Sequence, residues 1–364
     1  MTNTSRTIPS LDGARALSIA AVLAWHAYES LPEPVRALSF MHFLANQGLG
    51  VNVFFAISGF LITHLLLKED AACRSIDLRR FYFRRTLRIF PPFYAFLAVM
   101  AILALTGIRP QAPEELLSAA TYTWNYTANQ TPGWDLAHSW SLSLEEQFYL
   151  LWPACLVFLG PRRAQRFAVA ALVLSPISRL LTYALVPAWR GHIGMMLHTR
   201  VDCILFGCVL ALCWKSASFQ SRLKQLHRGW ILWAMLLFLC IGSPLLRGRF
   251  HGSYDLPLGL TLESACITVL LAWAIQNPAA RVGRFLNHPV AVHFGVRSYS
   301  LYIWQQIFCS PGSVFPVNIV LAVLAAEVSY VLVEKPSLRL RDWLEARWLS
   351  GAAAPIASSA QVAD

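Results

Sequence analysis

SLDGARALSIAAVLAWH, from Ser10 to His26, is an apolar run that holds one arginine, Arg15, and ends in a histidine. At about 100° per residue, the steps from Arg15 to His26 come within roughly 20° of three whole helical turns. A helix over this run therefore places both side chains on one face, about 16 Å apart along the axis. Ionisable side chains are costly in hydrocarbon and tend to face a bundle interior or a wet cavity. The pair predicts a functional site inside a membrane protein.

The composition extends this interpretation to the whole chain. Of its 364 residues, 56% are hydrophobic and 13% are charged, and 13 are tryptophan. Several apolar runs approach the roughly 20 residues that cross a bilayer. The sequence predicts an all-α, polytopic membrane protein with about ten transmembrane helices in one bundle and a cavity between the two membrane faces. The expected spans are 13–33, 47–67, 91–108, 141–160, 166–187, 195–214, 229–246, 257–275, 289–309 and 313–333.

The basic residues orient these spans. The formal net charge is +11, and the lysines and arginines gather between apolar runs rather than in one basic surface. Placing both termini in the cytoplasm puts these residues on the inner side by about four to one, as the positive-inside rule requires. We therefore expect cytoplasmic termini and no nucleic-acid partner. We also expect the first apolar run to be retained as a helix, because the N-terminus lacks a signal-peptide cleavage pattern.

Two segments carry charged residues at the ends of expected spans. RSIDLRRFYFRRTLR, residues 74–88, brings six arginines to the inner side. Arginine suits bidentate phosphate binding, although anionic lipid would attract the same segment, and both interpretations stay open. HSWSLSLEEQFYLLWP, residues 138–153, puts two adjacent carboxylates at the outer end of a span. They form either a helix-start cap or a partner for a buried base.

The outer segment 109–140 is rich in aromatic residues. Aromatic side chains commonly form a belt at the membrane interface, and they can also stack on sugar faces. We favour the belt for this group, which comprises Tyr122, Trp124, Tyr126 and Trp134.

Together these stretches resemble the acyltransferase-3 family of bacterial integral-membrane O-acyltransferases, over nearly the whole chain. Besides Arg15 and His26, the resemblance rests on motifs in family order: GVNVFFAISGFLIT (50–63), RRTLRIFPPFY (84–94), WSLSLEEQFY (140–149), RVDCILFG (200–207), SYSLYIW (298–304) and EKP (334–336). It implies an integral-membrane acyltransferase domain over residues 1–349 in the bacterial inner membrane. Residues 350–364 are expected to form a disordered cytoplasmic tail.

The resemblance also implies an activity. The family transfers an acyl group, commonly acetyl, from cytoplasmic acyl-CoA to a hydroxyl, often on a cell-surface polysaccharide or its lipid-linked precursor. Acyl-CoA would be a donor substrate, with no permanently bound cofactor and no metal. The expected partners are acyl-CoA, a glycan or glycoside acceptor and the lipid bilayer, without an obligate protein partner.

By motif position, the resemblance implies site residues of three kinds. The catalytic ones are His26, Arg15 and Glu145. The donor-binding ones are Arg84, Arg85 and Arg88. The substrate-binding ones are Trp140, Glu146, Arg200, Asp202 and Tyr299.

The chain departs from the family pattern at two places. Asn52 stands where the family often has an acid. Gln305 and Gln306 follow Trp304 where many members have a histidine. The second departure puts an outer histidine role at that position in doubt.

The residues fit the chemistry independently of the family. A sugar hydroxyl is a poor nucleophile at neutral pH, and histidine, with an ordinary pKa of about 6.5, suits the general base that must activate it. His26 is the candidate base. Arg15, nearer the cytoplasm, could bind the donor's phosphates or stabilise a developing oxyanion. Direct transfer and an acyl-histidine intermediate both stay open.

One alternative function comes from another class. In a secondary transporter or a flippase for a lipid-linked glycan, the intramembrane charges would line a substrate path. These charges are Arg15, His26, Arg179, Arg200, Asp202 and Arg297.

Overall fold

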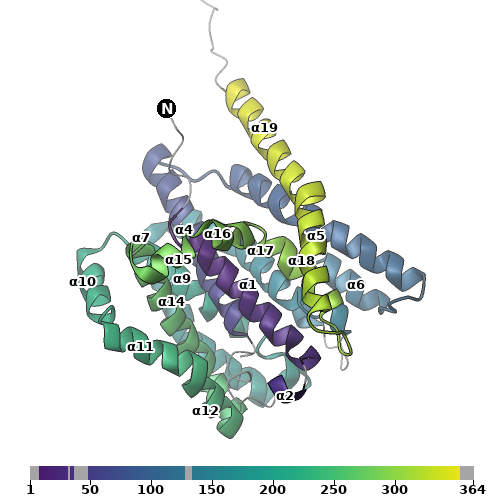
Figure 1. The fold of residues 1–364 in the computed structure, drawn as a ribbon. Helices are drawn as coiled ribbons and strands as arrows, with labels where there is room; N and C mark the ends of the chain where they lie inside the picture. Colours follow the sequence, from purple (N-terminus) through teal and green to yellow (C-terminus); the bar gives the residue numbers. More distant parts are fainter. Residues whose placement is uncertain (1–7, 32, 37–47, 128–132, 353–364) are drawn as a thin grey trace, which may run out of the picture.

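The structure is a computed structural model that describes residues 8–31, 33–36, 48–127 and 133–352. Within these ranges the chain forms helices joined by turns, and no strand. Figure 1 shows α1 (Leu11–Ala27) crossing the middle of the bundle, with α4, α16 and α17 beside it. The prediction of an all-helical fold is confirmed.

Six helical stretches of the described chain are long and apolar enough to cross a membrane. They comprise α4 (Leu49–Cys73), α5 (Leu78–Leu105), α7 (Ser139–Leu185), α11 with α12 (Gly229–Leu237 and Ser243–Phe250), α13 with α14 (Gly252–Tyr254 and Leu260–Gln276), and α18 with most of α19 (Val317–Ser329 and Lys335–Ala352). π-helical turns at η5 (Phe238–Gly242), η6 (Asp255–Gly259) and η7 (Tyr330–Glu334) join the pieces of the last three.

The other expected spans are shorter or interrupted. The run 195–214 divides into α8 (Leu197–Arg200) and α9 (Asp202–Cys213), and the run 289–309 divides into α16 (Pro289–Val296) and α17 (Ser298–Phe308). Two expected spans join in α7, which bends at Gly160, where φ is 70°. An arginine lies at the break between α8 and α9 and another at the break between α16 and α17. The side chain of each forms a hydrogen bond to a residue of another helix. The count of about ten spans stays a prediction.

Short elements complete the described fold. They are η1 (Tyr28–Ser30), α2 (Glu33–Arg36), α6 (Pro113–Ala120), η2 (Trp124–Tyr126), η3 (Trp134–Leu136), η4 (Pro187–His192), α10 (Ala217–Leu226), α13 (Gly252–Tyr254) and α15 (Arg281–Leu286).

Glycines let the central helices approach closely. A Cβ on Gly59 of α4 would lie 2.0 Å from the carbonyl oxygen of Ile204, and one on Gly207 of α9 would lie 2.1 Å from that of Ala56. α4 and α9 therefore pack backbone against backbone, as small residues allow between membrane helices. This contact places the start of α4 and the start of α9 within the same core.

The start of α1 and the far end of α19 lie toward the same end of the bundle (Figure 1). This arrangement agrees with termini on one side of a membrane, and the assignment of that side to the cytoplasm stays a prediction. α19 ends at Ala352. The predicted tail lies outside the described residues from residue 353 onward.

Candidate functional site

His26 lies in the last turn of α1, where a hydrogen bond from its ring to a backbone carbonyl fixes the orientation of the ring. Nδ1 is 2.9 Å from the carbonyl oxygen of Val22. A carbonyl oxygen can only accept, so Nδ1 carries the hydrogen and Nε2 of the neutral ring presents its lone pair. The ring meets Trp134 edge-on, with centroids 5.6 Å apart and planes at 82°. His26 can therefore take up a proton on Nε2.

Gln306 of α17 holds the segment that covers His26. Its backbone carbonyl accepts a hydrogen bond from Trp134 Nε1 at 3.0 Å, and its side-chain oxygen accepts one from the His138 backbone N–H at 3.0 Å. Trp134 thus packs against the candidate base and stays partly exposed. Trp124, 3% exposed, and Tyr122, 8% exposed, are buried, so the belt prediction is wrong for these two residues and stays a prediction for Trp134 and Tyr126.

His138 is a further buried histidine that the sequence reasoning missed. Its side chain is 3% exposed and lies between the rings of Phe96 and Tyr302. It is near enough to His26 for charges on the two rings to interact. Only its place two residues before Trp140 in the fourth-span motif could have drawn attention to it.

A cluster of charges lies along α5 and α7 near the first half of α1. The Arg85 guanidinium stacks on the Tyr149 ring at 3.7 Å, and Glu145 accepts a hydrogen bond from Ser58 Oγ at 2.7 Å. The charges of Arg15 and Arg85 act on Glu145. The structure thus brings together residues that are far apart in sequence and that the motifs singled out.

Arg88 extends this cluster. Its charge interacts with those of Arg15, Arg85 and Glu334, yet it forms no ion pair within the described part of the chain. Glu334, from the EKP motif, is buried and accepts a hydrogen bond from Ser300 Oγ at 2.7 Å. Arg15 pairs with Asp12 at 3.0 Å, one turn earlier on α1. The cluster leaves Arg85 and Arg88 able to bind further anions.

Arg84 lies elsewhere than the sequence suggested. Its Nε donates to Glu345 Oε2 of α19 at 2.8 Å, and Arg80 Nε donates to Glu345 Oε1 at 2.7 Å. The guanidinium of Arg84 is therefore occupied by the C-terminal helix. Its donor-binding role stays a prediction, with less geometric support than that of Arg85 or Arg88.

Arg200, the last residue of α8, and Asn52, near the start of α4, form a buried polar contact. Arg200 Nη2 donates to Asn52 Oδ1 at 2.8 Å, and Asn52 Nδ2 donates to Glu263 Oε2 at 3.2 Å. The Arg200 guanidinium also lies 5.6 Å from the centroid of the Trp140 ring. The amide of Asn52 thus connects an arginine to an acid that the sequence did not single out.

Asp202 is enclosed. Its Oδ2 is 3.0 Å from Arg179 Nη1, both side chains are fully buried, and Thr261 Oγ1 donates to the same oxygen at 2.6 Å. This closed salt bridge indicates a structural role, and the substrate-binding role predicted for Asp202 gains no support from it.

The remaining predicted substrate-binding residues lie around the charge cluster. The Tyr299 hydroxyl donates to the carbonyl oxygen of Ile89 at 2.9 Å. Glu146 lies near enough to Arg85 for their charges to interact. The Glu146 side chain makes no hydrogen bond to a described residue. In the described ranges, no group of histidine, cysteine and acidic side chains is arranged to hold a metal ion.

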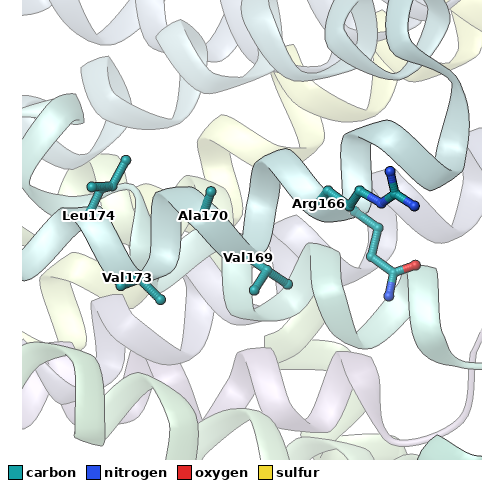
Figure 2. A pocket seen from close by; sticks show the side chains of 6 residues that line it. Arg166, Val169, Ala170, Val173 and Leu174 are labelled. Carbon is teal, nitrogen blue, oxygen red and sulfur yellow. The ribbon is translucent and has the colours of Figure 1, made fainter.

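A surface groove lies apart from these residues. Figure 2 shows it along the second half of α7, where Arg166, Val169, Ala170, Val173 and Leu174 come from one helix. Its apolar side chains are largely exposed, as on a surface that faces lipid. The groove contains none of the predicted site residues.

Comparisons with known proteins agree with the motifs. Residues 8–316 match a family model described as an acyltransferase domain. Over 91% of its length the chain is 28% identical to the O-acetyltransferase OatA of Staphylococcus aureus strain NCTC 8325 / PS 47, covering 57% of that protein. The same values hold for OatA of strain COL. The chain thus spans about half the length of the curated relatives it matches. No solved structure matches it.

Proposed function

The chain belongs to the acyltransferase-3 family, and we propose that it moves an acyl group, acetyl above all, from cytoplasmic acyl-CoA to a hydroxyl of a sugar. The acceptor would be a cell-surface polysaccharide, its lipid-linked precursor or a glycoside. The family match and the relatives named as O-acetyltransferases support an enzyme of this class. We propose the bacterial inner membrane as its location, with both termini in the cytoplasm.

The observation that carries the proposal is that Arg15 and His26 lie near opposite ends of α1. Arg15, near its start, joins Arg85 and Arg88 in a cluster of cations whose charges would attract phosphate groups. His26, near its end, presents Nε2 as a proton acceptor. The extended arm of acyl-CoA would connect the two, with its phosphates at the arginines and its thioester beside the histidine.

The transfer step follows from this arrangement. His26 Nε2 removes the proton of the acceptor hydroxyl while the hydroxyl oxygen attacks the thioester carbon. The new C–O bond forms, the C–S bond breaks, and the imidazolium returns the proton to the CoA thiolate. A cation or N–H donor stabilises the negative charge that develops on the carbonyl oxygen. No redox partner is needed.

The transporter alternative has less support. It needs the intramembrane charges to line an open path, whereas Arg179 and Asp202 form a closed salt bridge with fully buried side chains. The match to an acyltransferase family also favours an enzyme over a transporter.

The proposal is tested by thiol release. Purified protein in liposomes would receive acetyl-CoA with and without sugar acceptors, and free CoA thiol would be measured together with the mass of the acceptor. We expect acceptor-dependent thiol release and a sugar heavier by one acetyl group. Sugar that crosses the liposome membrane without thiol release would contradict the proposal and support the transporter.

A further inference from the structure

Arg200 is a buried cation that contacts no carboxylate among the described residues. Its side chain belongs to a residue that is 6% exposed, and its hydrogen-bond partner is the neutral amide oxygen of Asn52. Its Nε is buried without a hydrogen-bond partner. Arg179, by contrast, donates to both oxygens of Asp202, at 3.2 and 3.0 Å. Buried charges normally need such a partner. Arg179 has one, and Arg200 does not.

The acid behind Asn52 does not neutralise Arg200 at close range. Glu263 reaches only the amide nitrogen of Asn52, at 3.2 Å. Its other oxygen accepts from Arg247 Nη2 at 2.9 Å and from Ser243 Oγ at 2.5 Å. The carboxylate of Glu263 therefore pairs with Arg247, which it contacts directly, rather than with Arg200.

The surroundings of the Arg200 guanidinium favour an anion. α4 begins after Gly48 with no side-chain cap, and the amino end of a helix carries a partial positive charge. A Cβ on Gly48 or Gly194 would lie 3.6 or 3.5 Å from the nitrogens of Arg200, so glycines flank the group on two sides. The Trp140 ring, 5.6 Å from the guanidinium carbon, offers a flat apolar surface beside it.

This site lies next to the turn of α1 that leads to His26. Ser18 Oγ donates to the carbonyl oxygen of Gly50, and a Cβ on Gly50 would lie 2.8 Å from Val22 Cγ2. Val22 is the residue whose carbonyl oxygen orients His26. The first turn of α4 thus packs against the turn of α1 that fixes the candidate base.

We propose that Arg200, the start of α4 and Trp140 bind an anionic group of the acceptor sugar, a carboxylate or a phosphate, while the sugar ring lies on Trp140. This inference rests on the proposed function and names the class of its acceptor: an acidic or phosphorylated sugar. The inner arginines hold the donor, and Arg200 holds the acceptor.

The test measures binding rather than turnover, so that it does not depend on transfer. Purified protein would be titrated calorimetrically with methyl glucuronide, glucose 1-phosphate and methyl glucoside, with CoA at saturation to occupy the inner arginines. We expect at least one anionic sugar to bind about tenfold or more tightly than the neutral one, as a charge-assisted hydrogen bond predicts. The stronger of the two anionic probes identifies the source, carboxylate or phosphate.

Three variants decide whether Arg200 is responsible. Arg200→Gln should bring the ratio of anionic to neutral affinity close to one, whereas Arg200→Lys, which keeps the charge, should keep part of it. Arg190→Gln removes an exposed arginine of η4 and should leave the ratio unchanged. Should the Gln variant fail to fold, the Lys variant decides the question, because a ratio of one in a folded Lys variant contradicts the proposal.

Two further outcomes separate this inference from the proposed function. Equal affinity for all three sugars in the unchanged protein, together with acceptor-dependent thiol release, would refute the anion site and keep the acyltransferase. Selective anion binding that depends on Arg200, without thiol release from any acceptor, would keep the anion site and refute the transfer activity.

Discussion

Exchanging the arginines of α5 one at a time should separate donor binding from structure. Arg85 and Arg88 face the charge cluster without an ion pair to a described residue, whereas Arg84 is paired with Glu345. Removing one charge-assisted contact to a phosphate loses about 1.5–3 kcal/mol, or about 10- to 150-fold in affinity. Both side chains are partly exposed, so we expect the lower part of this range for Arg85→Gln and Arg88→Gln.

Arg84→Gln is the matched control on the same helix. The side chain of Arg84 is 42% exposed, and a surface ion pair is worth about 0–1 kcal/mol, so the KM for acetyl-CoA should change less than about fivefold. The assay is the KM for acetyl-CoA at fixed acceptor, together with the Kd of CoA by calorimetry. An Arg84→Gln variant that weakens CoA binding as much as Arg88→Gln would refute the distinction between the arginine that is paired with Glu345 and those that are not.

Three other predictions concern the scaffold. Gly59→Ala should lower the yield of folded protein sharply, because its Cβ would lie 2.0 Å from the carbonyl oxygen of Ile204; size-exclusion chromatography in detergent measures this, and a normal yield would contradict the close packing. Asp202→Asn should lower stability by about 3–5 kcal/mol, because it leaves Arg179 buried without its counter-charge; SDS-induced unfolding measures this, and an unchanged midpoint would argue against a structural salt bridge. Reporters fused after Arg347 should be active as cytoplasmic reporters and silent as periplasmic ones, and the reverse would overturn the predicted orientation.

The sequence predicts the helical class because long apolar runs in a membrane can satisfy their backbone only as helices. It predicts the existence and the start of α1 but not its end, because the expected span runs to residue 33 whereas α1 ends at Ala27 and a 3-10 turn follows. It does not predict the breaks at Val201 and Arg297, because one or two charged residues within an otherwise apolar run do not by themselves end a helix. Hydropathy records which segments are apolar, not where their polar side chains find partners.

The site shows the same limit. The sequence singled out Arg15 and His26 by their spacing and Glu145 by its motif. These residues lie on α1 and α7 of the helical bundle. Partners remote in sequence were not predictable: Glu345 pairs with Arg84 from 261 residues away, and Glu263 lies behind Asn52 from 211 residues away. Only the folded chain shows which arginines have a carboxylate and which do not.

The central claim is that His26 accepts the proton of the acceptor hydroxyl, and His26→Gln tests it most directly. Gln keeps a hydrogen-bonding side chain of similar reach but takes up no proton at neutral pH, so it should rescue a structural histidine and not a catalytic one. Acceptor-dependent thiol release from acetyl-CoA would be compared in the unchanged protein, His26→Gln and His26→Ala at equal amounts of folded protein. We predict a loss of about 100- to 10,000-fold in both variants, with the Kd of CoA little changed. A His26→Gln variant that retains a substantial fraction of the transfer rate would contradict the account.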